Sequence, residues 1–140
     1  MRKMETYLAE NVFSSISILH NSAIPVGDVC VCGSRGWFYD DAVASDKKVL
    51  LREACRLDTS ITLGEKLGLE TVVFLHYPPL YNEFVCQEIM EVLLNHQIKR
   101  CYYGHLHGRA ATYALEGMHN GILFRLISAD HLRFSPLAVD

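Results

Sequence analysis

Short apolar runs alternate with longer amphipathic segments through the middle of the chain, and this alternation most constrains the fold. The runs at 29–32, 71–75 and 100–103 are apolar and too short for helices, as is typical of buried strands. Segments with helical spacing, from residue 45 or 46 to about 67 and from 84 to 94, separate them. A strand–helix–strand–helix–strand order predicts a parallel sheet with right-handed helical crossovers.

Three further elements are expected before this alternating region. Residues 2–11 have the pattern of a short helix. The segment 15–20 alternates and is rich in isoleucine, so it predicts a strand. A turn is expected at 21–25, and Gly27-Asp28 predicts a second turn just before the first buried strand.

The last part of the chain predicts an antiparallel hairpin. Its strands are expected at 112–115 and 122–128, around a turn at Asn120-Gly121. The sequence thus predicts the α/β class, with a mostly parallel sheet, flanking helices and a C-terminal antiparallel hairpin. At 140 residues the chain suits a single domain over 1–140.

Composition restricts the environment and the partners. Half of the residues are hydrophobic and the net charge is -3, with a pI near 6.1, so we expect a globular protein with no nucleic-acid surface. No apolar run is long enough to cross a membrane, and residues 1–5 do not resemble a signal peptide. The five cysteines include no C-x-x-C pair. We interpret them as buried free thiols of a cytoplasmic protein, the alternatives being ligands or disulfides.

The ends of the three predicted parallel strands carry the residues that suggest chemistry. Arg35 follows the first strand, His76 the second, and His105 and His107 the third. If the backbone is extended there, His105 and His107 point to the same side. Three imidazoles at the carboxyl edge of a sheet would suit zinc, manganese or iron, and the guanidinium of Arg35 would suit a phosphate group.

Each of these residues also has a simpler interpretation. Taken alone, His76 reads as a core histidine and Arg35 as a solvated loop residue. The His105 and His107 pair, between a buried strand and a glycine, favours a ligand role. The other histidines lie near expected turns or element ends and are interpreted as surface residues; they are His20, His96, His119 and His131.

Two motifs resemble those of the calcineurin-like metallophosphoesterases. The segment Leu75-His76-Tyr77-Pro78-Pro79 resembles the family's H-x-P motif, and Gly104-His105-Leu106-His107 resembles its G-H-x-H motif, in the family's order. The loop 32–37 is similar to one in a bacterial branch of predicted phosphohydrolases. The resemblance implies half of a four-layer sandwich. It also implies that His76 and His105 bind one metal of a dinuclear pair and His107 the other, and that the metals activate a hydroxide that attacks a phosphoester.

The family's earlier D-x-H, G-D and G-N-H motifs have no counterpart here, since Gly27-Asp28 precedes a strand and reads as a turn. The expectation is therefore a C-terminal half of the family's domain that binds at most one divalent transition metal ion and associates with itself. Its expected function is metal-dependent hydrolysis of a phosphorylated small molecule or other phosphoester, with weak activity of this chain alone. The alternatives are a non-catalytic metal-binding or interaction module, left as a truncated remnant, and a structural domain with vestigial histidines.

Overall fold

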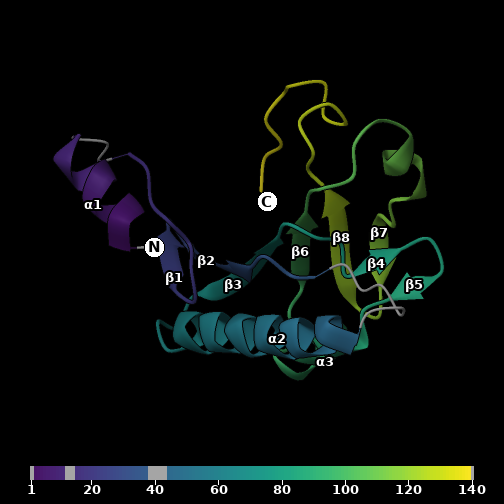
Figure 1. The fold of residues 1–140 in the computed structure, drawn as a ribbon, viewed down its shortest axis with the longest axis horizontal. Helices are drawn as coiled ribbons and strands as arrows, with labels where there is room; N and C mark the ends of the chain where they lie inside the picture. Colours follow the sequence, from purple (N-terminus) through teal and green to yellow (C-terminus); the bar gives the residue numbers. More distant parts are fainter. Residues whose placement is uncertain (1, 12–14, 38–43, 140) are drawn as a thin grey trace.

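The computed structural model describes residues 2–11, 15–37 and 44–139 (Figure 1). The helices are α1 (Arg2–Glu10), α2 (Ala44–Glu65), α3 (Gln87–Asn95) and the 3-10 helix η1 (Gly108–Tyr113). The strands are β1 (Ala23–Val26), β2 (Val29–Ser34), β3 (Glu70–Leu75), β4 (Leu80–Tyr81), β5 (Phe84–Val85), β6 (Arg100–Tyr103), β7 (Gly117–His119) and β8 (Ile122–Leu126). Among the described residues, no helix has both the length and the apolar character needed to cross a membrane.

The main sheet has the order β1-β2-β3-β6-β8-β7. The four central strands, β2, β3, β6 and β8, run parallel to one another. At the two edges, β1 pairs antiparallel with β2, and β7 pairs antiparallel with β8. A separate antiparallel hairpin joins β4 and β5. These pairings confirm the predicted α/β class with a mostly parallel sheet.

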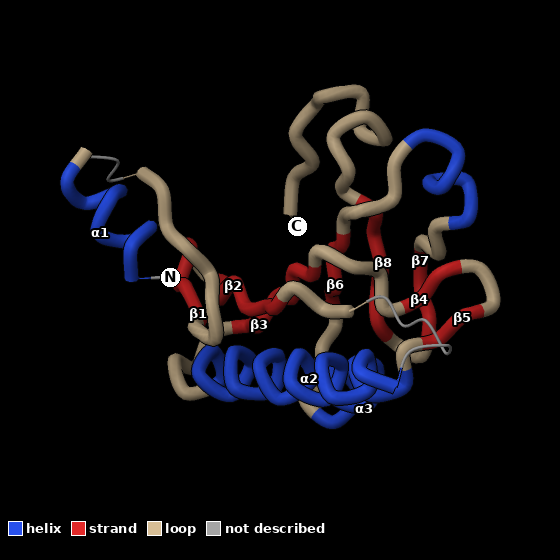
Figure 2. The backbone as a smooth tube through the Cα atoms, in the orientation of Figure 1, coloured by secondary structure: helices blue, strands red, loops and turns tan. Residues whose placement is uncertain are grey.

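Helices α2 and α3 cover the same face of the sheet (Figure 2). Leu57 and Ile61 of α2 and Leu93 of α3 are fully buried with Val73 and Phe124 of the strands. Gly64 allows α2 to approach β2 closely, because a Cβ at this position would lie 2.5 Å from the sulfur of Cys32. The apolar spacing that predicted the helices therefore forms the core.

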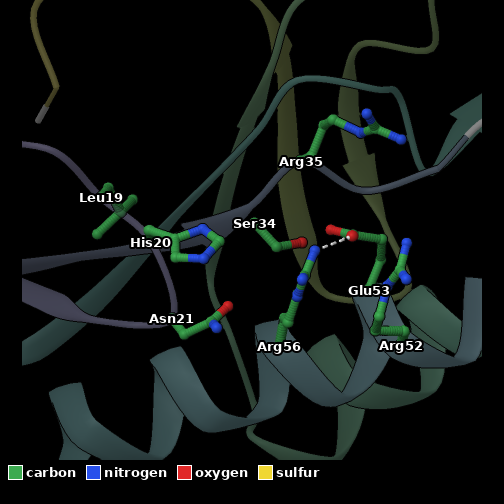
Figure 3. A pocket seen from close by; sticks show the side chains of 8 residues that line it. All are labelled: Leu19, His20, Asn21, Ser34, Arg35, Arg52, Glu53 and Arg56. Carbon is green, nitrogen blue, oxygen red and sulfur yellow. Dashed lines mark hydrogen bonds and ion pairs between the residues drawn. The ribbon is translucent and has the colours of Figure 1, made fainter. Parts of the chain in front are cut away.

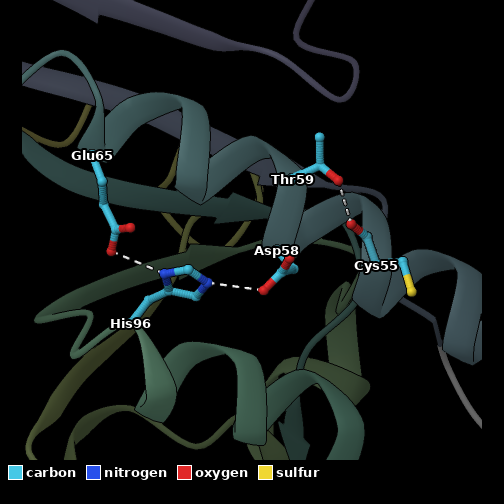
Figure 4. Close-up of polar contacts among 5 residues, drawn as sticks. All are labelled: Cys55, Asp58, Thr59, Glu65 and His96. Carbon is cyan, nitrogen blue, oxygen red and sulfur yellow. Dashed lines mark hydrogen bonds and ion pairs between the residues drawn. The ribbon is translucent and has the colours of Figure 1, made fainter.

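His96, at the end of α3, connects α3 to two carboxylates of α2 (Figure 4). Its Nδ1 lies 2.9 Å from Glu65 Oε1 and its Nε2 3.0 Å from Asp58 Oδ1. The side chain is only 16% exposed, so its interpretation as a simple surface residue is wrong. Burial lowers the pKa of His96, but the hydrogen bonds that its ring donates to the two carboxylates outweigh burial and raise the pKa above the usual value.

The first strand lies later in the chain than predicted. Residues 15–20 form no strand, and the segment expected as a turn contains β1. The turn at Gly27-Asp28 explains the difference: it is a two-residue connection that pairs Val26 with Val29, so the residues just before it occupy the sheet edge. Pro25, which cannot donate a ladder hydrogen bond, is tolerated there because β1 is an edge strand.

Other boundaries also differ from the predictions. Helix α2 begins at Ala44, one or two residues before the expected start. The segment from Phe84 forms β5 first, and α3 starts only at Gln87. The expected strand at 112–115 is replaced by η1 and β7, because the Asn120-Gly121 turn, with positive φ at both residues, pairs His119 with Ile122 and places the strand directly before the turn.

All five cysteines are free, and four of them are buried. Burial raises the pKa of Cys86 to about 11 and that of Cys32 to about 12, with the neighbouring Cys30 adding to the second shift. Cys55 on α2 is exposed. The prediction of buried free thiols is thus confirmed except at Cys55.

Candidate metal centre

The candidate residues follow strands that end at one edge of the sheet. Because β2, β3 and β6 are parallel, Arg35, His76 and the Gly104–Gly108 loop all leave the sheet at its carboxyl edge. The structure adds a fourth contributor: β8 pairs parallel with β6, so residues 127–131 leave the sheet at the same edge. The sequence predicted the first three strand ends and not the fourth.

His76 and His105 face each other at this edge. Nδ1 of His105 lies 3.2 Å from Nε2 of His76. Their ring centroids are 5.0 Å apart and the ring planes are inclined by 72°. Two imidazole nitrogens that bind one ion at about 2.0–2.1 Å are separated by roughly 3.0–3.4 Å, so this pair has a spacing that fits a shared zinc-like ion.

An aromatic group surrounds the pair. The ring of Tyr77 lies 4.7 Å from that of His76 and 4.4 Å from that of His105, measured between centroids. Tyr77 also lies edge-on to Trp37 at 6.0 Å, and the guanidinium of Arg35 stacks over Trp37 at 4.5 Å. A backbone hydrogen bond from Tyr77 to the carbonyl of Arg35, 3.0 Å long, holds the two strand-end loops together. Arg35 is therefore connected to the histidine pair through Tyr77 and Trp37.

The backbone at His105 is not extended as the sequence argument assumed. His105 has φ of +71°, and the Leu106 N–H donates to the carbonyl of Gly104 at 2.9 Å. This is a tight three-residue turn, a strained conformation for a residue with a Cβ. Leu106 is buried, whereas His105 and His107 are both exposed. The turn, rather than strand alternation, determines how His105 meets His76.

His107 has a different partner, Asp130, which sequence reasoning missed. Nδ1 of His107 lies 2.7 Å from Asp130 Oδ1, and the Gly108 N–H donates to Asp130 Oδ2 at 2.9 Å. The Gly108 hydrogen bond and then the His107 contact lower the pKa of Asp130 to about 2. Asp130 lies beyond β8, so no local motif could have indicated it; only the parallel pairing of β8 with β6 brings it here.

The environment favours the neutral form of His105. Burial lowers its pKa first, and the nearby His76 and His107 lower it further. A neutral imidazole has a nitrogen lone pair available to a metal ion. An ionised Asp130 that accepts the Nδ1 proton of His107 would likewise leave Nε2 of His107 as the free acceptor.

The three predicted ligands thus divide into a facing pair, His76 with His105, and a His107–Asp130 pair. Over residues 2–11, 15–37 and 44–139 no three histidine, cysteine, aspartate or glutamate side chains converge closely enough to hold one ion. The expected convergence of all three imidazoles stays a prediction. Comparisons with protein-family models, curated proteins and solved structures found no match.

Proposed function

We propose that this chain is a metal-dependent phosphoester hydrolase, or the metal-binding part of one, with its centre at the carboxyl edge of the sheet. The observation that carries the proposal is the 3.2 Å between His105 Nδ1 and His76 Nε2, a spacing suited to one shared ion. The H-x-P and G-H-x-H resemblance supports the same function.

The imidazoles suit zinc, manganese or iron, and a bound ion would supply a hydroxide near neutral pH and neutralise charge on phosphoryl oxygens. His76 and His105 would hold it, and Nε2 of His107 would become a third donor only if its loop moved to the ion, because no three such side chains converge in the part of the chain that the structure describes. Asp130 fixes the tautomer of His107 by accepting the Nδ1 proton. Arg35 would bind the phosphoryl oxygens, since its guanidinium keeps its charge while stacked on Trp37.

The proposal extends to fold family and assembly. We infer that the domain is the C-terminal half of a four-layer metallophosphoesterase sandwich, because α2 and α3 cover the same face of the sheet. We also propose that the chain forms a homo-oligomer, since the sheet ends in two edge strands, β1 and β7. The free buried thiols favour the cytoplasm.

A non-catalytic metal-binding module is the second candidate. The described site favours it, because the imidazole pair has room for one ion and no carboxylate among the described residues joins the pair to bridge two ions. A single ion can bind phosphate without clamping both the attacking and the leaving oxygen.

Calorimetric titration with zinc and manganese, followed by an aryl phosphate assay, tests the proposal. We expect one weakly bound equivalent per chain, and slow turnover that His105→Ala abolishes. One equivalent without turnover would select the binding module. No bound metal would refute the metal centre, and two tight equivalents would contradict the single-ion site.

A further inference from the structure

A separate cavity lies between α2, the end of β2 and the segment before β1 (Figure 3). Its volume is about 190 Å³. The residues that line it are Leu19, His20, Asn21, Ser34, Arg35, Arg52, Glu53 and Arg56. None of the three histidines of the candidate metal centre lines this cavity.

Three arginines and one carboxylate line the cavity, and Arg35 stacks over Trp37. Arg56 Nη1 lies 2.6 Å from Glu53 Oε1, and Glu53 is only 2% exposed. This ion pair balances a buried carboxylate and fixes the guanidinium of Arg56 beside Ser34 and His20 (Figure 3). The side chain of Arg52 forms no ion pair or hydrogen bond with any residue that the structure describes. Within the described ranges, only Arg56 of the three lining arginines forms an ion pair, so the cavity carries excess positive charge in a chain of net charge -3.

The walls of the cavity are fixed by buried hydrogen bonds. Ser60 on α2 donates its hydroxyl to the carbonyl of Ser22 at 2.6 Å and accepts the N–H of Gly33 at 2.9 Å. These bonds hold the segment before β1 against both α2 and β2. The hydroxyl oxygen of Ser34 accepts the Gly36 N–H at 3.0 Å, so the proton of that hydroxyl can be donated into the cavity.

The size of the cavity limits the ligand. A volume of about 190 Å³ is below the range of drug-sized pockets, so the cavity suits a small ligand. A single phosphate or carboxylate group with a carbon chain of about three atoms matches this space. Arg52, Arg56 and Ser34 offer donors to the oxyanion, and the carboxylate of Glu53, which faces the cavity in Figure 3, can accept from a ligand hydroxyl.

We propose that this cavity, between Arg52, Arg56 and Ser34, is a binding site for a small hydroxylated oxyanion. The shared chemistry is that of a three-carbon phosphate or a three-carbon carboxylate. Arg35 lines this cavity and also belongs to the proposed metal centre, but the donors assigned here, Arg52, Arg56 and Ser34, are guanidinium and hydroxyl groups that need no metal ion. Its ligand binds without a metal ion.

The test is a titration of the ¹⁵N-labelled full chain in EDTA, followed by NMR. The probes are inorganic phosphate, glycerol phosphate and glycerate. Binding should shift the amide signals of Asn21, Ser34 and Gly36, most strongly for a probe that combines an oxyanion with a hydroxyl. Stronger binding of glycerol phosphate than of glycerate would identify the phosphate class, and the reverse order the carboxylate class.

Arg52→Gln should weaken the binding about tenfold, as expected for the loss of one charge-assisted hydrogen bond. Its exposed position leaves the fold intact. Arg125→Gln, an exposed arginine on β8, is the matched control and should leave the affinity unchanged. Equal losses in both variants, no shifts with any probe, or shifts that appear only when zinc or manganese replaces EDTA would each overturn the proposal. None of these results depends on whether the metal centre binds metal.

Discussion

Two histidines in different regions of this molecule have surroundings that shift their pKa values in opposite directions. At the helical layer, His96 lies between Asp58 and Glu65, and its pKa is raised. At the sheet edge, His105 faces His76 and lies near His107, and the pKa of His105 is lowered. The carboxylates favour the protonated ring, whereas burial and the neighbouring imidazoles favour the neutral one.

This difference indicates how the two regions divide their roles. The bonds of His96 connect α3 to α2, so this histidine stabilises the packing of the helical layer. His105 occupies a strained backbone position and contacts other potential ligands, features that cluster at functional sites. We therefore expect substitutions in the helical layer to change stability, and those at the sheet edge to change binding.

The largest expected effect is the loss of metal affinity when a facing imidazole is removed. His76→Ala should weaken zinc binding at least about 100-fold, because even the loss of a carboxylate that only orients a ligand costs about 10–100-fold. His96→Ala should leave the affinity unchanged. Calorimetric titration of both variants measures the contrast. Similar affinities in the two variants would show that zinc binds elsewhere.

A smaller loss of affinity is expected when Asp130 no longer holds His107. Asp130→Asn should weaken zinc binding about tenfold, since the carboxylate that accepts the Nδ1 proton is replaced by an amide. Asp58→Asn is the matched control, because it alters a histidine–aspartate pair of the same kind in the helical layer. An unchanged affinity in Asp130→Asn would remove His107 from the ligand set.

The sequence predicted the central architecture because that part depends on local patterns. Strands β3 and β6 and the crossover helices follow from apolar runs and helical spacing, and they bring His76 to the same edge as His105. The edge strands depend instead on turn geometry, so β1 and β7 were misplaced by several residues.

The site was harder to predict than the fold. Its two pairs depend on contacts between residues far apart in the chain: His76 with His105, and His107 with Asp130. The first followed from strand order. The second required the parallel pairing of β8 with β6, which a hairpin pattern does not indicate. The positive φ of His105 was also unpredictable, because the histidine follows a glycine that could itself have formed the turn.

The helical layer should show a pH-dependent stability of opposite sign to that of the sheet edge, because the pKa of His96 is raised and that of His105 is lowered. His96→Asn should lower the free energy of unfolding by about 1.5 kcal/mol at pH 6, since two partly exposed charge-assisted bonds are lost. Because the folded pKa of His96 is raised, its stabilisation is fully present below the unfolded value near 6.5 and is lost as the pH rises through the folded pKa.

Urea unfolding of wild type and His96→Asn between pH 5 and 9 measures this effect. The difference between the two proteins should shrink as the pH rises. A difference that stays constant over this range would mean that His96 stabilises the helices by packing rather than by charge.

The smallest expected effect concerns the backbone strain at His105. A non-glycine residue with φ near +70° costs roughly 1 kcal/mol, so His105→Gly should be about 1 kcal/mol more stable than His105→Ala. Both variants remove the imidazole and its contacts with His76 and Tyr77, so the difference between them isolates the backbone. At Glu91, an exposed position inside α3, the order should reverse, with alanine more stable than glycine by about 1 kcal/mol. Thermal unfolding of the four variants gives both differences. Alanine as the more stable residue at both positions would mean that the turn at His105 relaxes without cost, and that strain does not distinguish the sheet edge from the helical layer.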